Sequence, residues 1–254
     1  MDRPHRGPAG PAGTGGAPVT ADLPAGQASR AIVEARDVVK SFGQTPALRG
    51  ACIAVGPGEI VAVMGPSGSG KSTLLHCLSG ILVPDQGEAW FAGQRLDTLT
   101  ETQRSEVRRD KFGFVFQSGQ LVPELTAEEN VALPLLLGGA RRAAALAEAR
   151  AWLGRLGLDG LGRRRSGELS GGQAQRVALA RGMVAGPQVL FADEPTGSLD
   201  SVSGEMVMSL MTRAAREQGS TVILVTHDAR VAAYADREII VRDGAISTLT
   251  GVEP

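Results

Sequence analysis

Residues 59–73 read EIVAVMGPSGSGKST, and this stretch decides the fold of the chain. Its first six residues form an almost continuous apolar run that ends at a glycine, a pattern typical of a buried strand in a parallel sheet. A helix is predicted to begin near Lys71. Two later runs resemble the first, QVLFADEP at residues 188–195 and TVILVTHD at residues 221–228, with a helical stretch between them. Strands that alternate with helices predict an α/β fold with a mostly parallel sheet.

An antiparallel edge is predicted ahead of this stretch. Residues 31–42 (AIVEARDVVKSF) and 47–56 (ALRGACIAVG) are expected to be strands joined by a turn around Gly43–Pro46. Further along, residues 140–158 (ARRAAALAEARAWLGRLGL) predict an amphipathic helix with a short partner, because this region is rich in Ala, Leu, Arg and Glu. We therefore expect an inserted α-helical subdomain at about residues 118–182.

The composition limits the remaining possibilities. Residues 1–29 are dominated by Gly, Pro and Ala and cannot bury enough apolar surface, so we expect a disordered tail ahead of one domain, residues 30–254. A net charge of -1 argues against a nucleic-acid-binding protein. Cys52 and Cys77 are predicted to be reduced, buried thiols. No run of about 18 apolar residues is present, so no membrane span is expected.

Residues 65–73 fit the phosphate-loop pattern G-x-x-x-x-G-K-[ST], and they lie between a predicted strand and a predicted helix, as that pattern requires. Glycines let backbone N–H groups approach phosphates closely, and the start of a helix adds a favourable partial charge. Lys71 is expected to reach the β- and γ-phosphates, and the Ser72 hydroxyl to ligate Mg²⁺. The predicted nucleotide-binding residues of the loop are Gly65, Ser67, Gly68, Ser69, Gly70, Lys71, Ser72 and Thr73.

Two adjacent carboxylates follow the second apolar run. Asp193 ends the run, so its carboxylate is expected at the C-terminal edge of the sheet, where it would be a further Mg²⁺ ligand. Glu194 projects differently and is expected near an attacking water. Paired acids of this kind also cap helices or stay solvated, but the phosphate loop favours the metal and water roles.

Residues 169–173 read LSGGQ, a match that chance would produce in on the order of one in a thousand chains of this length. It resembles the signature motif of ATP-binding cassette (ABC) ATPases, and the resemblance covers about residues 31–244. It implies a P-loop NTPase core. Phe42 resembles the adenine-stacking aromatic, Gln117 the Q-loop glutamine and Asp193 the Walker B aspartate. Glu194 resembles the catalytic glutamate, Asp200 belongs to a segment that resembles the D-loop, and His227 resembles the switch histidine.

The resemblance also implies a mechanism. In the family, the signature belongs to the opposite subunit, so two ATP molecules are held in a head-to-tail homodimer. Glu194 is then the general base or water-positioning group, His227 stabilises the γ-phosphate, and Gln117 links Mg²⁺ to the helical subdomain. The signature residues expected to contact the nucleotide are Ser170, Gly171, Gly172 and Gln173. Phe42 replaces the commoner tyrosine, so we expect adenine stacking with weak base selectivity.

Three other classes of ATPase carry a similar site. Chromosome-structure and DNA-repair ATPases insert a long coiled coil, but only about a hundred residues separate Lys71 from Ser170, without sustained heptads. Translation-associated ATPases usually have two cassettes, whereas this chain has one P-loop and one signature. A cytosolic assembly ATPase remains the alternative to a transporter subunit.

The text around the Q-loop is similar to the MacB/LolD group of ABC exporters. The similarity runs over residues 108–139 and is carried by Ser118–Asn130. It implies a separate membrane permease, export or extraction of cargo, and a peripheral place on the cytoplasmic side of the membrane. Apolar residues here are expected to receive the permease, although each could equally fill the subdomain core; they are Leu121, Val122, Leu125 and Leu133.

Overall fold

The computed structural model describes residues 31–248, so the predicted disordered tail, residues 1–29, lies outside the described residues. A six-stranded sheet forms the centre, in the order β10-β9-β3-β8-β7-β6. Its neighbours are parallel except for the β9–β10 pair. These strands are β3 (Ile60–Met64), β6 (Phe112–Phe116), β7 (Val189–Asp193), β8 (Thr221–Val225), β9 (Arg237–Arg242) and β10 (Ala245–Thr248). The three apolar runs are β3, β7 and β8, and the α/β prediction is confirmed.

A four-stranded antiparallel sheet lies beside it, in the order β2-β1-β4-β5. Its strands are β1 (Val33–Phe42), β2 (Thr45–Val55), β4 (Gln86–Phe91) and β5 (Gln94–Arg95). The predicted turn was too long, because Phe42 pairs with Thr45 and Pro46 is already in β2. Proline is tolerated there because β2 is an edge strand. The sequence analysis did not predict β4 or β5.

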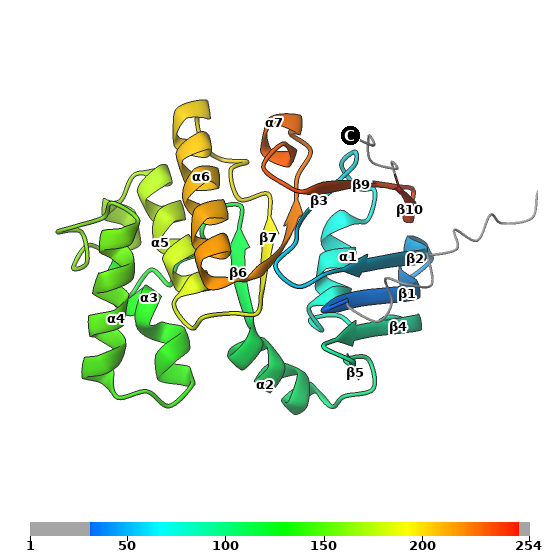
Figure 1. The fold of residues 1–254 in the computed structure, drawn as a ribbon, viewed down its shortest axis with the longest axis horizontal. Coiled ribbons are helices and arrows are strands. Elements are labelled where there is room, and N and C mark those ends of the chain that lie inside the picture. The colour runs from blue at the N-terminus through cyan, green and yellow to red at the C-terminus, as the bar shows by residue number, and fades with distance from the viewer. Residues whose placement is uncertain (1–30, 249–254) are drawn as a thin grey trace, which may run out of the picture.

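Helix α1 (Lys71–Leu78) contacts strands of both sheets and lies between them (Figure 1). The central strands send alternate side chains to two separate cores, as a period of two requires. Leu190 and Leu224 pack into the core on the helical side, whereas Phe191 and Val225 pack into the core around α1. The central sheet is therefore covered on both faces.

The helices α3 (Ala127–Leu137), α4 (Arg142–Arg155) and α5 (Gly171–Met183) pack against one another on the far side from β1 and β2 (Figure 1). They lie in the region for which a helical subdomain is expected. The remaining helical elements are α2 (Glu101–Lys111), η1 (Ser166–Glu168), α6 (Ser201–Gln218) and α7 (Ala229–Ala232). None of the helices between residues 31 and 248 is long and apolar enough to cross a membrane.

Backbone packs directly on backbone where α5 meets β6. A Cβ atom added at Gly113 in β6 would stand 2.1 Å from the carbonyl oxygen of Gly182 in α5. Glycine is therefore needed at this contact. The cysteines carry no such constraint: both are free, as predicted, but Cys77 is buried whereas Cys52 is only partly so.

Candidate nucleotide-binding site

The loop between β3 and α1 is closed around glycines. Gly65 has φ +148°, and a Cβ atom there would stand 2.2 Å from the carbonyl oxygen of Val241. Gly70 has φ +105°, and a Cβ atom there would stand 2.3 Å from the carbonyl oxygen of Ala47. Any side chain at either position would collide with backbone, so the loop keeps this shape only with glycine at both ends.

The start of α1 presents positive charge and free N–H groups. Its N-cap is Gly70, which offers no side-chain cap, and its first turn holds no acidic residue. Lys71 is buried, and its Nζ donates to the carbonyl oxygens of Gly65 and Pro66, each at 2.8 Å. Within the described part of the chain, the buried Ser69 Oγ has no hydrogen-bond partner. Uncapped helix N–H groups beside a cation suit a phosphate.

Oxygen donors suited to Mg²⁺ lie next to this loop. Asp193 ends β7, and the Ser72 Oγ donates to its Oδ1 at 3.2 Å. Residues 31–248 contain no cluster of three or more His, Cys, Asp or Glu side chains that could hold a metal by themselves. Mg²⁺ is commonly held by one or two carboxylates together with substrate phosphates, so a hydroxyl and a carboxylate are a fitting donor set.

Glu194 adopts a strained backbone at the end of β7. Its φ is +48°, which is uncommon for a residue other than glycine. Its N–H donates to the carbonyl oxygen of Val225 at 2.9 Å, which fixes it to β8. The His227 Nδ1 lies 2.8 Å from the Glu194 Oε1, and the Thr226 Oγ1 donates to the Oε2 at 3.4 Å. Both oxygens of the carboxylate are thus contacted by side chains of the segment that follows β8.

Most of these groups converge on a pocket of about 620 Å³, although Gly65, Ser69 and Asp193 do not line it. Ten of the predicted residues line it: Phe42, Ser67, Gly68, Gly70, Lys71, Ser72, Thr73, Gln117, Glu194 and His227. Ala47 and Pro66 also line the pocket and were not predicted, because they contribute walls rather than reactive groups. Phe42 is 54% exposed, so its ring face is accessible.

The signature residues begin a different helix, and none of them lines this pocket. Ser170 is the exposed N-cap of α5, and its Oγ accepts from the Gln173 N–H at 3.3 Å. In return, the Gln173 Oε1 accepts from the Ser170 N–H at 2.9 Å. This reciprocal pair is a capping box, so within one copy the serine and the glutamine satisfy each other.

Comparison with known proteins identifies the chain. The family model described as "ABC transporter" matches residues 48–197. The chain belongs to the ABC transporter family. Its P-loop NTPase fold is confirmed by the dimeric cassette MJ0796, whose structure aligns with a TM-score of 0.80 at 37% identity over 87% of this chain and 100% of the other. A dimeric post-hydrolysis state of MJ0796 bound to ADP and Pi aligns at 0.79 and 38% identity, over the same shares.

Curated ABC relatives confirm the predicted similarity to the MacB/LolD group. The macrolide export ATP-binding/permease protein MacB of Marinobacter nauticus is 45% identical over 88% of this chain. The alignment covers 35% of that protein, so the chain spans about a third of its length. The lipoprotein-releasing system ATP-binding protein LolD of Porphyromonas gingivalis is 43% identical over 85% of this chain and 98% of its own length.

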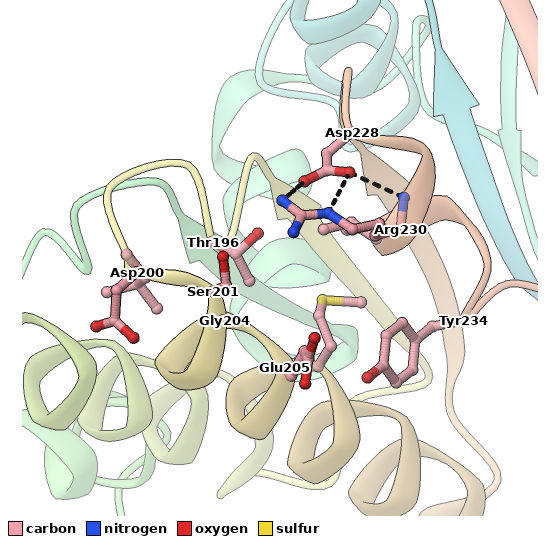
Figure 2. A pocket seen from close by; sticks show the side chains of 11 residues that line it. Thr196, Asp200, Ser201, Gly204, Glu205, Asp228, Arg230 and Tyr234 are labelled. Atoms are coloured by element: carbon pink, nitrogen blue, oxygen red, sulfur yellow. Dashed lines mark hydrogen bonds and ion pairs between the residues drawn. The ribbon is translucent and has the colours of Figure 1, made fainter.

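The predicted D-loop residue of this ABC cassette borders a second, smaller hollow. Figure 2 shows Asp200 and Asp228, which line this hollow. Its volume is about 70 Å³, which is too small for a nucleotide. Asp200 caps α6, accepting from the Ser203 N–H and hydroxyl at 2.9 and 2.8 Å. Asp228 pairs with Arg230, which lowers the pKa of Asp228. The predicted D-loop and the segment that follows His227 therefore both line this hollow.

Proposed function

We propose that this chain is an ABC ATPase that binds Mg·ATP in the 620 Å³ pocket and hydrolyses it as a head-to-tail pair of copies, thereby energising a separate membrane permease. One observation carries the proposal. The pocket unites Lys71, Glu194 and His227, whereas the exposed helix start at Ser170 lies outside it. A second copy is the partner that would bring such a helix start to the open side of the pocket.

The residues around the pocket divide the work of binding. Lys71 would exchange its two carbonyl partners for the β- and γ-phosphates, and the N–H groups at the start of α1 would hold phosphate oxygens. Ser72, Asp193 and Gln117 would hold Mg²⁺, which when bound neutralises phosphate charge. Phe42 would stack on the adenine ring, because its exposed face borders the pocket.

Glu194 and His227 would act on the attacking water. The Glu194 carboxylate would orient the water and accept its proton. When the His227 Nδ1–H donates to Glu194, the Nε2 of a neutral ring is an acceptor and cannot donate to a phosphate oxygen. His227 therefore stabilises the γ-phosphate either as an imidazolium or after turning away from Glu194.

The relatives support the wider role. MJ0796 forms dimers, which supports a homodimer here. MacB and LolD are named for macrolide export and lipoprotein release, which supports cargo export or extraction at the cytoplasmic side of a membrane. The permease would dock at the loop before α3, where half-buried apolar side chains gather; these are Leu121, Val122, Leu125 and, in α3, Leu133.

A Glu194→Gln variant tests the proposal. We expect it to bind ATP, to turn over about 10²- to 10⁴-fold more slowly, as removal of a general base does, and to elute as a dimer with ATP and a monomer without it. Turnover and size-exclusion chromatography are the measurements. Glu217→Gln, at an exposed site near the end of α6, is the matched control and should behave as wild type. An active Glu194→Gln variant that stays monomeric with ATP would refute the assignment.

A further inference from the structure

Helix α5 sends two polar side chains to the loop that follows β6. The Gln175 Nε2 donates to the carbonyl oxygen of Phe116 at 2.9 Å. The Arg181 guanidinium donates to the carbonyl oxygens of Gly119 and Gln120, each at 2.8 Å. Three carbonyl oxygens around Gln117 are therefore held by the helix that begins with the signature.

These contacts are costly for the molecule to keep. Gln175 is 1% exposed, and burial lowers the pKa of Arg181. Among the described residues, no carboxylate forms an ion pair with Arg181. Arg181 is partly buried, and even partial burial of a guanidinium without a counter-ion is unfavourable unless its hydrogen bonds are well made. The two hydrogen bonds from Arg181 to backbone carbonyl oxygens therefore replace water that its guanidinium loses on partial burial.

The loop itself adopts an unusual backbone. Gly119 has φ +69° and Gln120 has φ +43°, so two successive residues are left-handed and the second is not glycine. Such a conformation persists only where neighbouring groups hold it. Both carbonyl oxygens of this pair accept from Arg181. Arg181 thus stabilises the strained part of the loop.

The same loop is also fastened to the turn that follows β7 and Glu194. The Ser198 Oγ donates to the carbonyl oxygen of Gln117 at 2.8 Å. A Cβ atom at Gly197 would stand 2.8 Å from the Gln117 Nε2, so this glycine lets the side chain of Gln117 pass closely. Gln117 is therefore held between α5 and the segment that carries Glu194.

We propose that Arg181 and Gln175 are positioning residues that clamp the loop of residues 117–120 onto α5 and so keep the Gln117 side chain in the nucleotide pocket. The inference rests on the proposed function of that pocket. Because Gly113 and Gly182 also lock β6 onto α5, the clamp makes Gln117 follow the signature helix. A displacement of Ser170 by a second copy would then be transmitted to the pocket, because α5, β6 and residues 117–120 would move together.

Three variants of the full chain test the clamp. Arg181→Met removes both donors, Arg181→Lys keeps the charge but not the forked geometry, and Gln175→Leu removes the contact to Phe116. We expect each to lower the ATP turnover number and to raise the free Mg²⁺ concentration needed for half-maximal rate, with ATP affinity retained. The loss should be about tenfold for Arg181→Met, less than two charged hydrogen bonds contribute directly, because both lost contacts act on turnover only through Gln117; it should be smaller for Arg181→Lys.

The matched control is Arg108→Met. Arg108 also donates to a backbone carbonyl oxygen, that of Gly80, but neither residue lines the pocket, so its loss should leave the Mg²⁺ dependence unchanged. Thermal melting of every variant separates lost stability from lost positioning. If Arg181→Met does not fold, Arg181→Lys and Gln175→Leu carry the test.

A double-mutant cycle with Gln117→Ala gives the decisive result. Adding Arg181→Lys or Gln175→Leu to Gln117→Ala should cost nothing more, because the clamp acts through Gln117. If the losses of turnover multiply in the double variants, the clamp is wrong. The clamp is also wrong if Gln117→Ala is impaired while the clamp variants keep the Mg²⁺ dependence of the wild type. A wild-type chain without ATPase activity would instead refute the proposed function.

Discussion

The cassette contains two glycine-bearing helix starts that differ in how their N–H groups are satisfied. The start of α1 has Gly70 as its N-cap and no side-chain cap, whereas the start of α5 is closed by the Ser170–Gln173 capping box. The first lines a pocket beside Lys71, and the second is exposed. The uncapped start of α1 is thus suited to an anion, whereas the capping box at α5 already satisfies the N–H groups of Ser170 and Gln173. Under the proposed function, Ser170 would have to loosen this cap for its hydroxyl to contact a phosphate.

The largest effect should come from the uncapped start. Lys71→Ala removes the charge that faces the phosphates, and we expect ATP binding to weaken by about 100- to 1000-fold, from two charge-assisted hydrogen bonds. Isothermal titration calorimetry measures this. Lys111→Ala, at the exposed end of α2, is the control and should bind as wild type. Retained affinity in Lys71→Ala would remove the basis of the comparison.

The second effect concerns the capped start. Ser170→Arg in the Glu194→Gln background should still bind ATP, since Ser170 does not line the pocket. Its dimer should weaken by about 10- to 100-fold, because an overfilled contact costs about 1–3 kcal/mol. Analytical ultracentrifugation with ATP gives the dimer constant. An unchanged constant would mean that α5 does not face the nucleotide of a second copy.

A gentler change separates capping from recognition. Ser170→Ala should lower the free energy of unfolding by about 1 kcal/mol, as loss of an N-cap does. Thr126→Ala removes an equivalent capping box at α3 and should cost a similar amount. Urea denaturation compares the two, and only Ser170→Ala should also weaken the ATP-bound dimer. If Ser170→Ala and Thr126→Ala weaken the dimer equally, Ser170 is only a structural N-cap.

The smallest effect is expected at the start of α2, a helix start to which no ligand is assigned. Helix α2 begins with a capping box, and hydrogen bonds from Arg108 and Arg104 lower the pKa of Glu101 from 4.5 to about 2. A depressed pKa stabilises the fold above the unfolded pKa, so the stability difference between wild type and Glu101→Gln should be constant above about pH 4.5 and vanish towards pH 2. Urea midpoints across this range measure it, with Glu106→Gln, at an exposed site of the same helix, as the control.

Much of the fold could be predicted from sequence because its decisive strands are buried on both faces. Strands β3, β7 and β8 are continuous apolar runs, and the loop before Lys71 is a motif with a strict local geometry. Strand β4 was missed because QGEAWF mixes polar and apolar residues without a clean period. Pro46 misled the turn prediction, since an edge strand can hold a proline.

The site was predictable where chemistry depends on side-chain type and not where it depends on backbone. Lys71, Glu194 and His227 follow from motif and strand position, and they do line one pocket. Arg181 and Gln175 bind carbonyl oxygens, which every residue has, so no sequence pattern marks their targets. The positive φ of Gln120 is equally invisible in the sequence, because glutamine has no preference for it.

The left-handed backbone of Glu194 carries a lasting thermodynamic consequence. A side chain in this conformation costs of order 1–3 kcal/mol relative to a relaxed one, a strain that glycine at residue 194 would relieve while losing the contacts to Thr226 and His227. A protein with glycine there would lack the carboxylate to which the proposed function assigns the attacking water. Laboratory selection for thermal stability alone would therefore tend to replace Glu194, and the selected variants are expected to have lost ATP turnover.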